Sequence, residues 1–343
     1  MRTLRKAEQH VGLIGIDIGS TSVKLVELSG TPQALALENI SVIAVPDEAS
    51  SSAYERAVGL LLEGKELSTT RIATSVSGKK VALRGMRFPE LAKTELEGAI
   101  KFEGSQVIAF DLDEAYLDHT IVETGGDGPK GMDILFVAAR KEEVDAKLSV
   151  IEEVGLEPRV VGVDALVLLD ALEMVEELPE TYAVVDIGAS NTSIGIAHEG
   201  SVPFVRDVEI GGRDYTAAIA KALDVTLEDA EKVKVMEPER ELASMRAIEE
   251  VTRRLVGEIS RSLMYYQTRD RSTQVDALYV CGGSAGIPGI VEALSEAAGI
   301  EVYSWSPLDR VTVDDSRFDT EAVRRLASVS SLAAALAMKQ DPN

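Results

Sequence analysis

Asp17-Ile18-Gly19-Ser20-Thr21-Ser22, near the start of the chain, returns 169 residues later as Asp186-Ile187-Gly188-Ala189-Ser190-Asn191. Each copy lies between two short apolar runs, and runs of this length that end at a glycine-containing turn are typical of buried β-strands. The repeat therefore predicts two similar halves, each built on a strand, a tight turn and a second strand. The four apolar runs are residues 11–16, 23–28, 182–185 and 193–197.

Both turns have the composition of a phosphate-binding loop. Glycine permits backbone conformations that are closed to other residues, and small polar neighbours let several N–H groups converge on one anion. Lys24 adds a cation to the first turn, although by itself it also fits a solvated strand residue. The candidate phosphate-binding residues are Gly19, Ser20, Thr21, Ser22 and Lys24, and in the second half Gly188, Ala189, Ser190, Asn191 and Thr192.

An aspartate opens each turn, Asp17 in the first half and Asp186 in the second. A carboxylate beside a bare phosphate is unfavourable because like charges repel, but it is favourable if Mg²⁺ lies between them. We therefore expect both aspartates to hold Mg²⁺, through water. One Asp-Ile-Gly alone is a common junction between a strand and a turn, whereas two copies at the same structural position favour the phosphate interpretation.

A third glycine-rich turn, residues 282–290, follows an apolar run at residues 277–281 and leads into an expected helix. A backbone without side chains lets a flat ring approach, and a helix N-terminus offers unsatisfied N–H donors. Gly282, Gly283 and Ser284 are therefore candidate nucleotide-binding residues. As a lone glycine cluster, this turn would be weak evidence.

Composition limits the class of protein. The 343 residues favour two domains, and 45% hydrophobic with 27% charged residues indicates an ordinary globular chain. A net charge of −23 argues against nonspecific binding to nucleic acid and against direct adhesion to anionic lipid. The single cysteine, Cys281, predicts a reducing compartment and a small buried side chain.

We expect no signal peptide and no membrane-spanning segment. The apolar stretch after the basic N-terminus is interrupted at Asp17, and the uncharged, Ala- and Ser-rich run at residues 326–338 has 13 residues where a spanning helix needs about 20. The three histidines, His10, His119 and His198, show no ligand spacing, which argues against a transition-metal site.

The order of two Asp-Ile-Gly turns and then a Gly-Gly turn resembles the superfamily of actin, sugar kinases and heat-shock chaperones. That resemblance implies an α/β fold with ATP between two ribonuclease-H-like halves, two phosphate loops and an adenosine loop at Gly282 and Gly283. Glu231 and Lys234 fit a Glu-x-x-Lys pair that borders the adenosine in relatives, although such a pair also fits an exposed helix face. Gly211 and Gly212 resemble another recurring turn beside the nucleotide.

Nearly the whole chain resembles the PilM family, the actin-like, FtsA-related cytoplasmic components of type IV pilus machines. One departure is Ala109, where the family usually has proline. The resemblance rests on four segments, residues 15–28, 137–144, 230–234 and 258–263.

Between the halves, the sequence predicts an inserted β-α-β-β-α subdomain at residues 80–88, 89–106, 114–123, 132–139 and 142–154, with a hairpin at 124–131. The expected domains are 1–78 for subdomain 1A, completed by 159–178 and a C-terminal helix at 322–339; 79–158 for the inserted subdomain 1C; and 179–321 for subdomain 2A, with 2B near 224–272.

The resemblance implies that the insertion binds partner proteins rather than taking part in a reaction. In the PilM family, the groove between 1A and 1C receives the N-terminal tail of the inner-membrane protein PilN, so we expect a cytoplasmic protein held at the inner face of the membrane through that partner. Other pilus components, including the motor ATPase, and a homo-oligomer are further expected contacts. No direct membrane insertion is expected.

Three alternatives stay open at this point. The first is an FtsA-like filament-forming protein, although we expect a final Ala-rich helix at residues 324–338 rather than a basic amphipathic tail. The second is the type II secretion counterpart. The third is a small-molecule kinase of the same superfamily, which the lack of a substrate-pocket motif in the insertion disfavours.

Asp164 is the candidate catalytic residue. It follows an expected strand at residues 159–163 and begins a helix, where actin and the chaperones carry a Gln or Glu that orients water. It could act as a base or position water, and its rival role is a helix N-cap. Because Asp is shorter than Glu, we expect slow or partner-dependent ATP hydrolysis at most.

Overall fold

The computed structural model describes residues 12–46, 50–122, 131–174, 178–235, 242–269 and 274–342, and the expected hairpin loop at 124–130 lies outside them. The chain forms two compact units. The first unit holds residues 1–75, 146–176 and 305–343, and the second holds 76–145 and 177–304.

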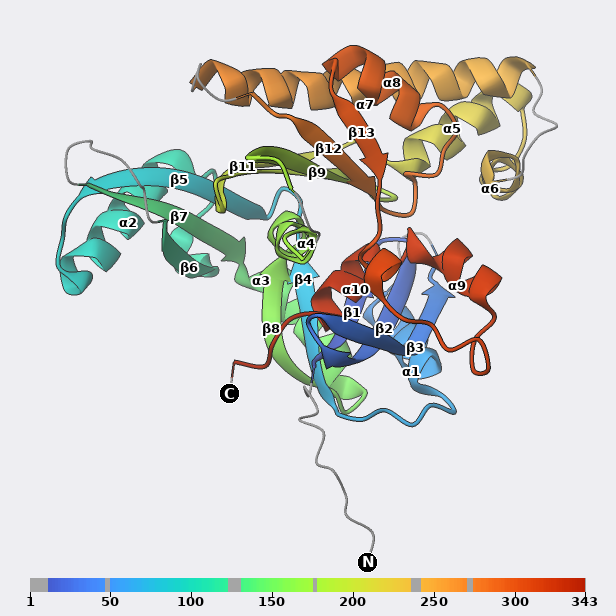
Figure 1. Cartoon of the computed structure of the whole chain (residues 1–343), viewed down its shortest axis with the longest axis horizontal. Coiled ribbons are helices and arrows are strands. Elements are labelled where there is room, and N and C mark those ends of the chain that lie inside the picture. Colours follow the sequence, from blue (N-terminus) through green and yellow to red (C-terminus); the bar gives the residue numbers. More distant parts are fainter. Residues whose placement is uncertain are drawn as a thin grey trace, which may run out of the picture. The chain divides into compact units, whose positions relative to one another are not determined.

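A five-stranded sheet forms the centre of the first unit, with the strand order β3-β2-β1-β4-β8 (Figure 1). Strands β1 to β3 are antiparallel, and β4 runs parallel to β1. The strands are β1 (Ile14–Ile18), β2 (Ser22–Thr31), β3 (Ala34–Ala44), β4 (Arg71–Val76) and β8 (Glu157–Val163). The first half of β2 is buried throughout, including the polar side chains of Ser22 and Lys24.

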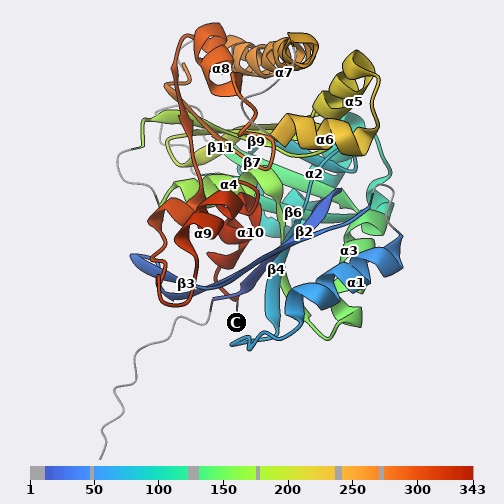
Figure 2. The same ribbon diagram turned by 90° about the vertical axis from the view of Figure 1, so that its right-hand side faces the viewer.

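Helices cover both faces of this sheet (Figure 2). Helices α1 (Ser51–Leu62) and α3 (Lys141–Glu153) pack on one face, through a core that includes Val58, Leu61 and Ile151. Helix α10 (Ser331–Ala337) packs on the other face, against β1 and β2, and α4 (Asp164–Leu172) packs against α10.

The expected single helix at residues 324–338 is in fact two helices, α9 (Thr320–Ala327) and α10. The break falls in a serine-rich stretch, where the Ser331 hydroxyl donates to the backbone oxygens of Ala327 and Ser328. Serine side chains compete with helical backbone hydrogen bonds in this way. The expected return of the C-terminal region onto the first half is confirmed by α10.

The second unit contains a sheet with the corresponding order, β11-β10-β9-β12-β13. When the strands of each sheet are numbered in chain order, both sheets have the order 3-2-1-4-5. The predicted internal repeat is therefore confirmed. The strands are β9 (Thr181–Ile187), β10 (Thr192–His198), β11 (Ser201–Val208), β12 (Ala277–Cys281) and β13 (Glu301–Ser304).

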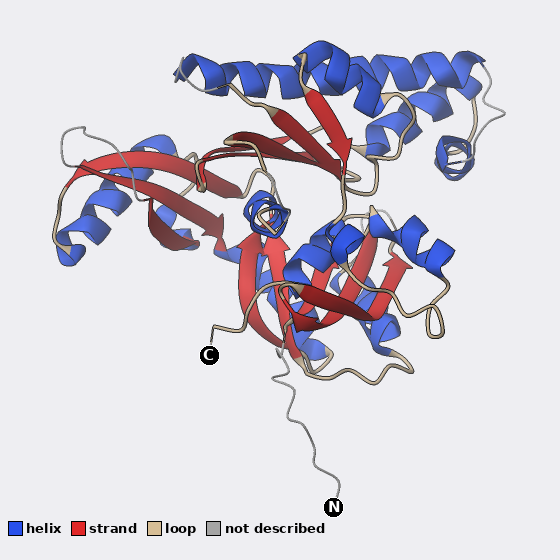
Figure 3. Ribbon diagram, in the orientation of Figure 1, coloured by secondary structure: helices blue, strands red, loops and turns tan. Residues whose placement is uncertain are grey.

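One face of this second sheet packs against helices (Figure 3). The shared core joins Val185, Ile194 and Val280 of the strands to Tyr215, Ile259 and Leu294 of the helices. The helices are α5 (Gly212–Leu223), α6 (Leu227–Val235), α7 (Leu242–Arg269) and α8 (Ile290–Ala298).

The predicted β-α-β-β-α order of elements is confirmed, although the last helix, α3, packs on the first sheet. The sheet of the insertion has the order β5-β7-β6, and α2 (Lys93–Val107) packs on one face. The strands are β5 (Val81–Pro89), β6 (Ala115–Val122) and β7 (Gly131–Arg140), with a 3₁₀ turn at Leu112–Glu114. Asp207 of β11 accepts the Gly78 N–H at 2.6 Å, which ties the start of the insertion to the second sheet. The finer subdomain limits inferred from the sequence stay predictions.

Glu27 is a buried carboxylate in the middle of β2. It accepts hydrogen bonds from the Ser68 N–H at 2.8 Å, the Ser68 hydroxyl at 2.6 Å and the Asn39 side-chain amide at 2.5 Å. These donors offset the cost of burying the charge, and they attach the loop before β4 to the sheet.

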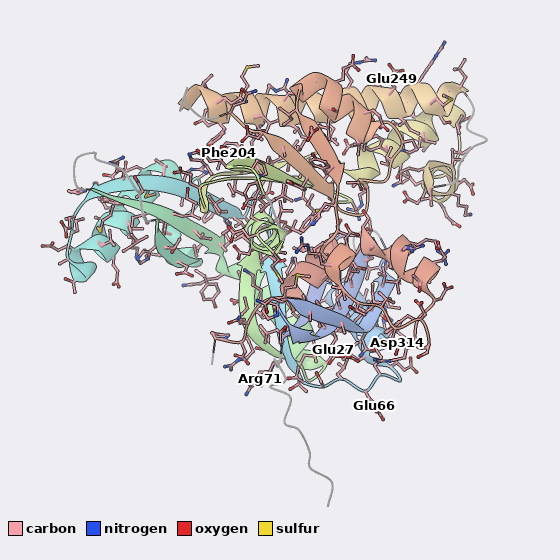
Figure 4. All side chains as sticks on the ribbon, in the orientation of Figure 1. Glu27, Glu66, Arg71, Phe204, Glu249 and Asp314 are labelled. Atoms are coloured by element: carbon pink, nitrogen blue, oxygen red, sulfur yellow. The ribbon has the colours of Figure 1, made fainter. Side chains whose placement is uncertain are left out.

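Glu27→Ala should lower the free energy of unfolding by about 2 kcal/mol, because three donors on Ser68 and Asn39 lose their buried acceptor. Glu66→Ala is the matched control, since Glu66 is exposed (Figure 4), and it should change stability by less than about 0.5 kcal/mol. Urea unfolding followed by circular dichroism measures both. Equal midpoints for the two variants would contradict the role given to Glu27.

Candidate functional site

The first Asp-Ile-Gly turn connects β1 to β2, and an ion pair closes it. Asp17 and Lys24 face each other across the two strands, and the Lys24 Nζ lies 2.8 Å from the Asp17 Oδ2. The backbone N–H of Gly19 donates to the Ser22 oxygen at 3.1 Å. Lys24 is buried, so the alternative of a solvated strand residue is wrong.

Gly19 leaves room for this arrangement, because a β-carbon there would lie 2.7 Å from the Lys24 Nζ. A side chain would push the ammonium away from the turn and from Asp17. A buried ammonium held by one carboxylate, with an open glycine edge beside it, can take a phosphate oxygen as a further partner.

The second turn repeats the first in its backbone. The Gly188 N–H donates to the Asn191 oxygen at 3.0 Å, as Gly19 does to Ser22. The Thr192 hydroxyl donates to the Ile210 oxygen at 2.7 Å. The predicted turn at Gly211 and Gly212 lies against it, since Gly212 N–H donates to the Gly188 oxygen at 2.9 Å. The structure thus brings these two predicted segments together.

The third turn, which follows β12, lies beside the second. Cys281 pairs with Asp186 across the parallel strands, and the Ser284 N–H donates to the Ile187 oxygen at 2.9 Å. Gly282 has a φ of +98°, and a β-carbon there would lie 2.1 Å from the Asp186 Oδ1. Only glycine lets this turn approach the aspartate so closely.

Cys281 behaves as the predicted small core residue. It is fully buried, and burial together with the nearby Asp186 carboxylate raises the pKa of its thiol well above the usual value. A thiol that stays protonated is a poor nucleophile. The structure therefore gives Cys281 a packing role beside the turn.

Helix α6 contributes the predicted Glu-x-x-Lys pair. The Lys234 Nζ lies 2.7 Å from the Glu231 carboxylate, 2.9 Å from the Thr216 hydroxyl and 3.2 Å from the Gly212 oxygen. The Thr216 hydroxyl in turn donates to Glu231 at 2.5 Å. Lys234 is only 10% exposed, so the alternative of an exposed pair fails for the lysine, although Glu231 remains 51% exposed.

Thr216 was not predicted as a site residue. It lies on α5 one helical turn after Gly212 and connects that turn to the α6 pair through its hydroxyl. The four-residue spacing after a glycine turn was the only signal for it in the sequence, and that spacing is common in helices.

Asp164 begins α4 as predicted and is buried. Val163 occupies the N-cap position, so the rival role of Asp164 as the N-cap residue is wrong. A carboxylate in the first turn still interacts favourably with the helix dipole. Asp164 is therefore a buried acid in the first turn of α4.

One histidine has acidic neighbours that the sequence spacing did not reveal. The ligand atoms of Glu180, His198 and Glu199 lie within 4.8 Å of one another, and both glutamates are exposed. The His198 Nδ1 is also 2.9 Å from the Thr181 hydroxyl. These residues could hold a divalent cation, although exposed acidic groups commonly gather without one.

Across the described ranges, no helix is both long and apolar enough to cross a membrane.

Comparison with known proteins agrees with this geometry. Residues 15–341 match the family model described as "Type IV pilus assembly protein PilM". A chain of the solved PilM-PilN type IV pilus biogenesis complex is 27% identical, with a TM-score of 0.84 and 96% of this chain and 98% of that chain covered.

More distant relatives share the fold. FtsA from Streptococcus pneumoniae serotype 2 is 22% identical, over 85% of this chain and 75% of that protein. MreB 5 of Spiroplasma citri bound to AMPPNP is 12% identical, with a TM-score of 0.51 and 94% of each chain covered. The expected actin-like ATPase fold is confirmed.

Gly282→Ala should destabilise the second unit by roughly 2–4 kcal/mol, because the new methyl group clashes with Asp186 and the backbone conformation is unfavourable for alanine. Gly286→Ala in the same turn is the control, since a β-carbon there meets nothing within 4 Å. Thermal unfolding compares them. A Gly282→Ala midpoint equal to that of Gly286→Ala would contradict the close approach.

Proposed function

Because the chain belongs to the PilM family of type IV pilus assembly proteins, we propose that it is an ATP-binding platform that holds the tail of a PilN-like inner-membrane protein. The observation that carries the nucleotide part is the pair of equivalent turns that begin at Asp17 and Asp186. The match to the PilM-PilN complex supports the partner.

We place the phosphates of ATP at the two turns. The buried Lys24 ammonium and the backbone N–H groups of the two turns, other than those of Gly19 and Gly188, suit phosphate oxygens. Asp17 and Asp186 would hold Mg²⁺, which prefers carboxylate and water oxygens. That ion would neutralise the phosphate charge that the two carboxylates otherwise repel.

We place the adenosine at the cluster made by Gly211, Gly212, Glu231, Lys234 and the third turn. Between the buried Gly282 and Ser284, the exposed Gly283 leaves a backbone surface without bulk, and the Glu231 carboxylate can accept hydrogen bonds from ribose hydroxyls. Lys234 fixes Glu231 in place through their 2.7 Å contact.

The partner part of the proposal concerns the insertion. We propose that the groove between the first half and the insertion holds the PilN-like tail, so that the protein stays at the inner face of the membrane through this partner. Contacts with other machine components, including the motor ATPase, and a homo-oligomer are part of the same proposal. FtsA is 22% identical to this chain, so the comparison gives only weak support to the alternative of a filament-forming protein.

Lys234→Met should weaken ATP binding roughly 10- to 100-fold, because the loss of a charged hydrogen-bond donor costs about 1.5–3 kcal/mol and releases Glu231. Lys232→Met is the control on the same helix, since Lys232 is 59% exposed and pairs with Glu228 and Asp229. Isothermal titration measures both. Equal losses in the two variants would remove Lys234 from the adenosine site.

Asp164→Asn should lower any ATP turnover about 100-fold, as expected for the loss of a general base or water-positioning group. ATP affinity and thermal stability should stay close to those of the unmodified chain. A sensitive phosphate-release assay gives the turnover. Unchanged turnover would assign Asp164 a structural role only.

A peptide with the sequence of a PilN-like N-terminal tail should bind the full chain at least tenfold tighter with ATP and Mg²⁺ than without them, because nucleotide binding to both turns stabilises the binding-competent arrangement. Fluorescence anisotropy measures this, and a scrambled peptide is the control. No binding of the tail in saturating ATP would contradict the platform function.

A further inference from the structure

The edges of the three sheets differ in how they are protected from pairing with another chain. An exposed edge strand presents unpaired N–H and C=O groups, and natural proteins blunt such edges with charges, prolines, short strands or covering segments. The described strands provide six edges, namely β3, β8, β11, β13, β5 and β6. Five of them carry one of these devices.

In the first sheet, Thr312 covers β3 by exchanging hydrogen bonds with Leu35 and Leu37 at 2.8 and 2.9 Å. Strand β8 contains Pro158, which has no N–H, and Arg159, whose guanidinium binds Asp341 at 3.4 Å. Both edges of this sheet are therefore protected.

In the second sheet, β13 has only four residues. Strand β11 carries Asp207, which binds the Gly78 N–H, and Glu209, directly after the strand, pairs with Lys79 at 2.6 Å. In the insertion, β5 carries Arg84 and Arg87 and ends at Pro89.

Strand β6 is the least protected of the six: Asp118 is its one charged residue, and no described segment pairs with its outer edge. Its eight residues, Ala115–Val122, contain no lysine, arginine or proline, and they pair with β7 without a bulge. Tyr116, Leu117 and Ile121 are 49%, 38% and 53% exposed. A long, regular and apolar edge of this kind is a site for pairing with another strand.

The backbone and side chains of β6 indicate how a further strand would bind. The His119 N–H donates to the Asp118 carboxylate at 2.8 Å instead of to β7, so the N–H groups of the odd-numbered residues point away from the sheet. Leu117 and Ile121 lie opposite Ala138 and Ile134, which form the apolar layer under α2. These two side chains extend that layer past the last strand.

We propose that β6 accepts an extended segment of a partner protein as a fourth strand of the insertion sheet. This segment has apolar residues at alternate positions, which cover Leu117 and Ile121, and it carries basic residues. The charge follows from Asp118 on the strand, from Asp111 and Glu114 just before it, all three of them exposed, and from the net charge of −23.

A second copy of this chain is a poorer occupant. It brings the same three acids and the same net charge to the interface, and like charges across a strand pair are destabilising. The pairing at β6 also needs no nucleotide, so it is independent of the ATP-dependent platform and adds a second partner surface to it.

The test uses the full chain and a labelled octapeptide that alternates valine or isoleucine with threonine and lysine. Its twin carries glutamate in place of each lysine. The basic peptide should bind at least tenfold tighter than the acidic twin, and the amides of Leu117, His119 and Ile121 should gain hydrogen-exchange protection when it is bound.

Two variants separate the edge from the rest of the fold. Leu117→Pro removes one outward N–H and should weaken basic-peptide binding at least tenfold. Ile121→Lys keeps the backbone donors, but its positive charge repels the basic peptide, so it should also weaken binding at least tenfold. This second variant keeps the test valid if Leu117→Pro unfolds. Leu60→Lys is the control, because Leu60 on α1 is also 53% exposed.

Four results would overturn the proposal. The first is that the two peptides bind equally, and the second is that Ile121→Lys binds the basic peptide as tightly as the unmodified chain does. The third is that the chain self-associates and Ile121→Lys abolishes this. The fourth is that the PilN-like tail peptide protects the same three amides. The third result would show that a second copy of the chain pairs with β6. The fourth would show that β6 is part of the site that binds the PilN-like tail. Failure of the tail to bind anywhere would contradict the platform alone.

Discussion

The ion pair between Asp17 and Lys24 is the contact on which the first half of the site depends. Both groups are largely withdrawn from water, so each needs the other to offset the cost of burial. Their 2.8 Å contact fits a tight turn between β1 and β2 in which Gly19 leaves room for the Lys24 ammonium. In the second half, Asp186 imposes the same kind of constraint, because the third turn can approach it only with glycine at position 282.

These constraints explain why the structure of the two Asp-Ile-Gly turns was predictable from the sequence. A carboxylate, a glycine and small polar residues at the end of a buried strand leave few structural solutions, and the second copy removed most of the ambiguity. The insertion was predictable for a similar reason, since its strands and helices follow clear local periodicities. The start of α4 at Asp164 also follows from local sequence.

Other features depend on contacts between distant residues and could not be predicted. The Thr216 hydroxyl joins two helices around Lys234, and no local pattern indicates that contact. The grouping of His198 with Glu180 requires the pairing of β9 and β10. The break between α9 and α10 reflects competition by serine side chains, which a composition rich in alanine conceals.

The central claim is that the two aspartate turns bind one Mg²⁺-nucleotide, and calorimetric titration of ATP into the full chain tests it most directly. The account predicts one ATP per chain in Mg²⁺ and an affinity at least tenfold weaker in EDTA, because the carboxylates then repel the phosphates. Equal affinity in both conditions, or no binding by the folded chain at millimolar ATP, would contradict it.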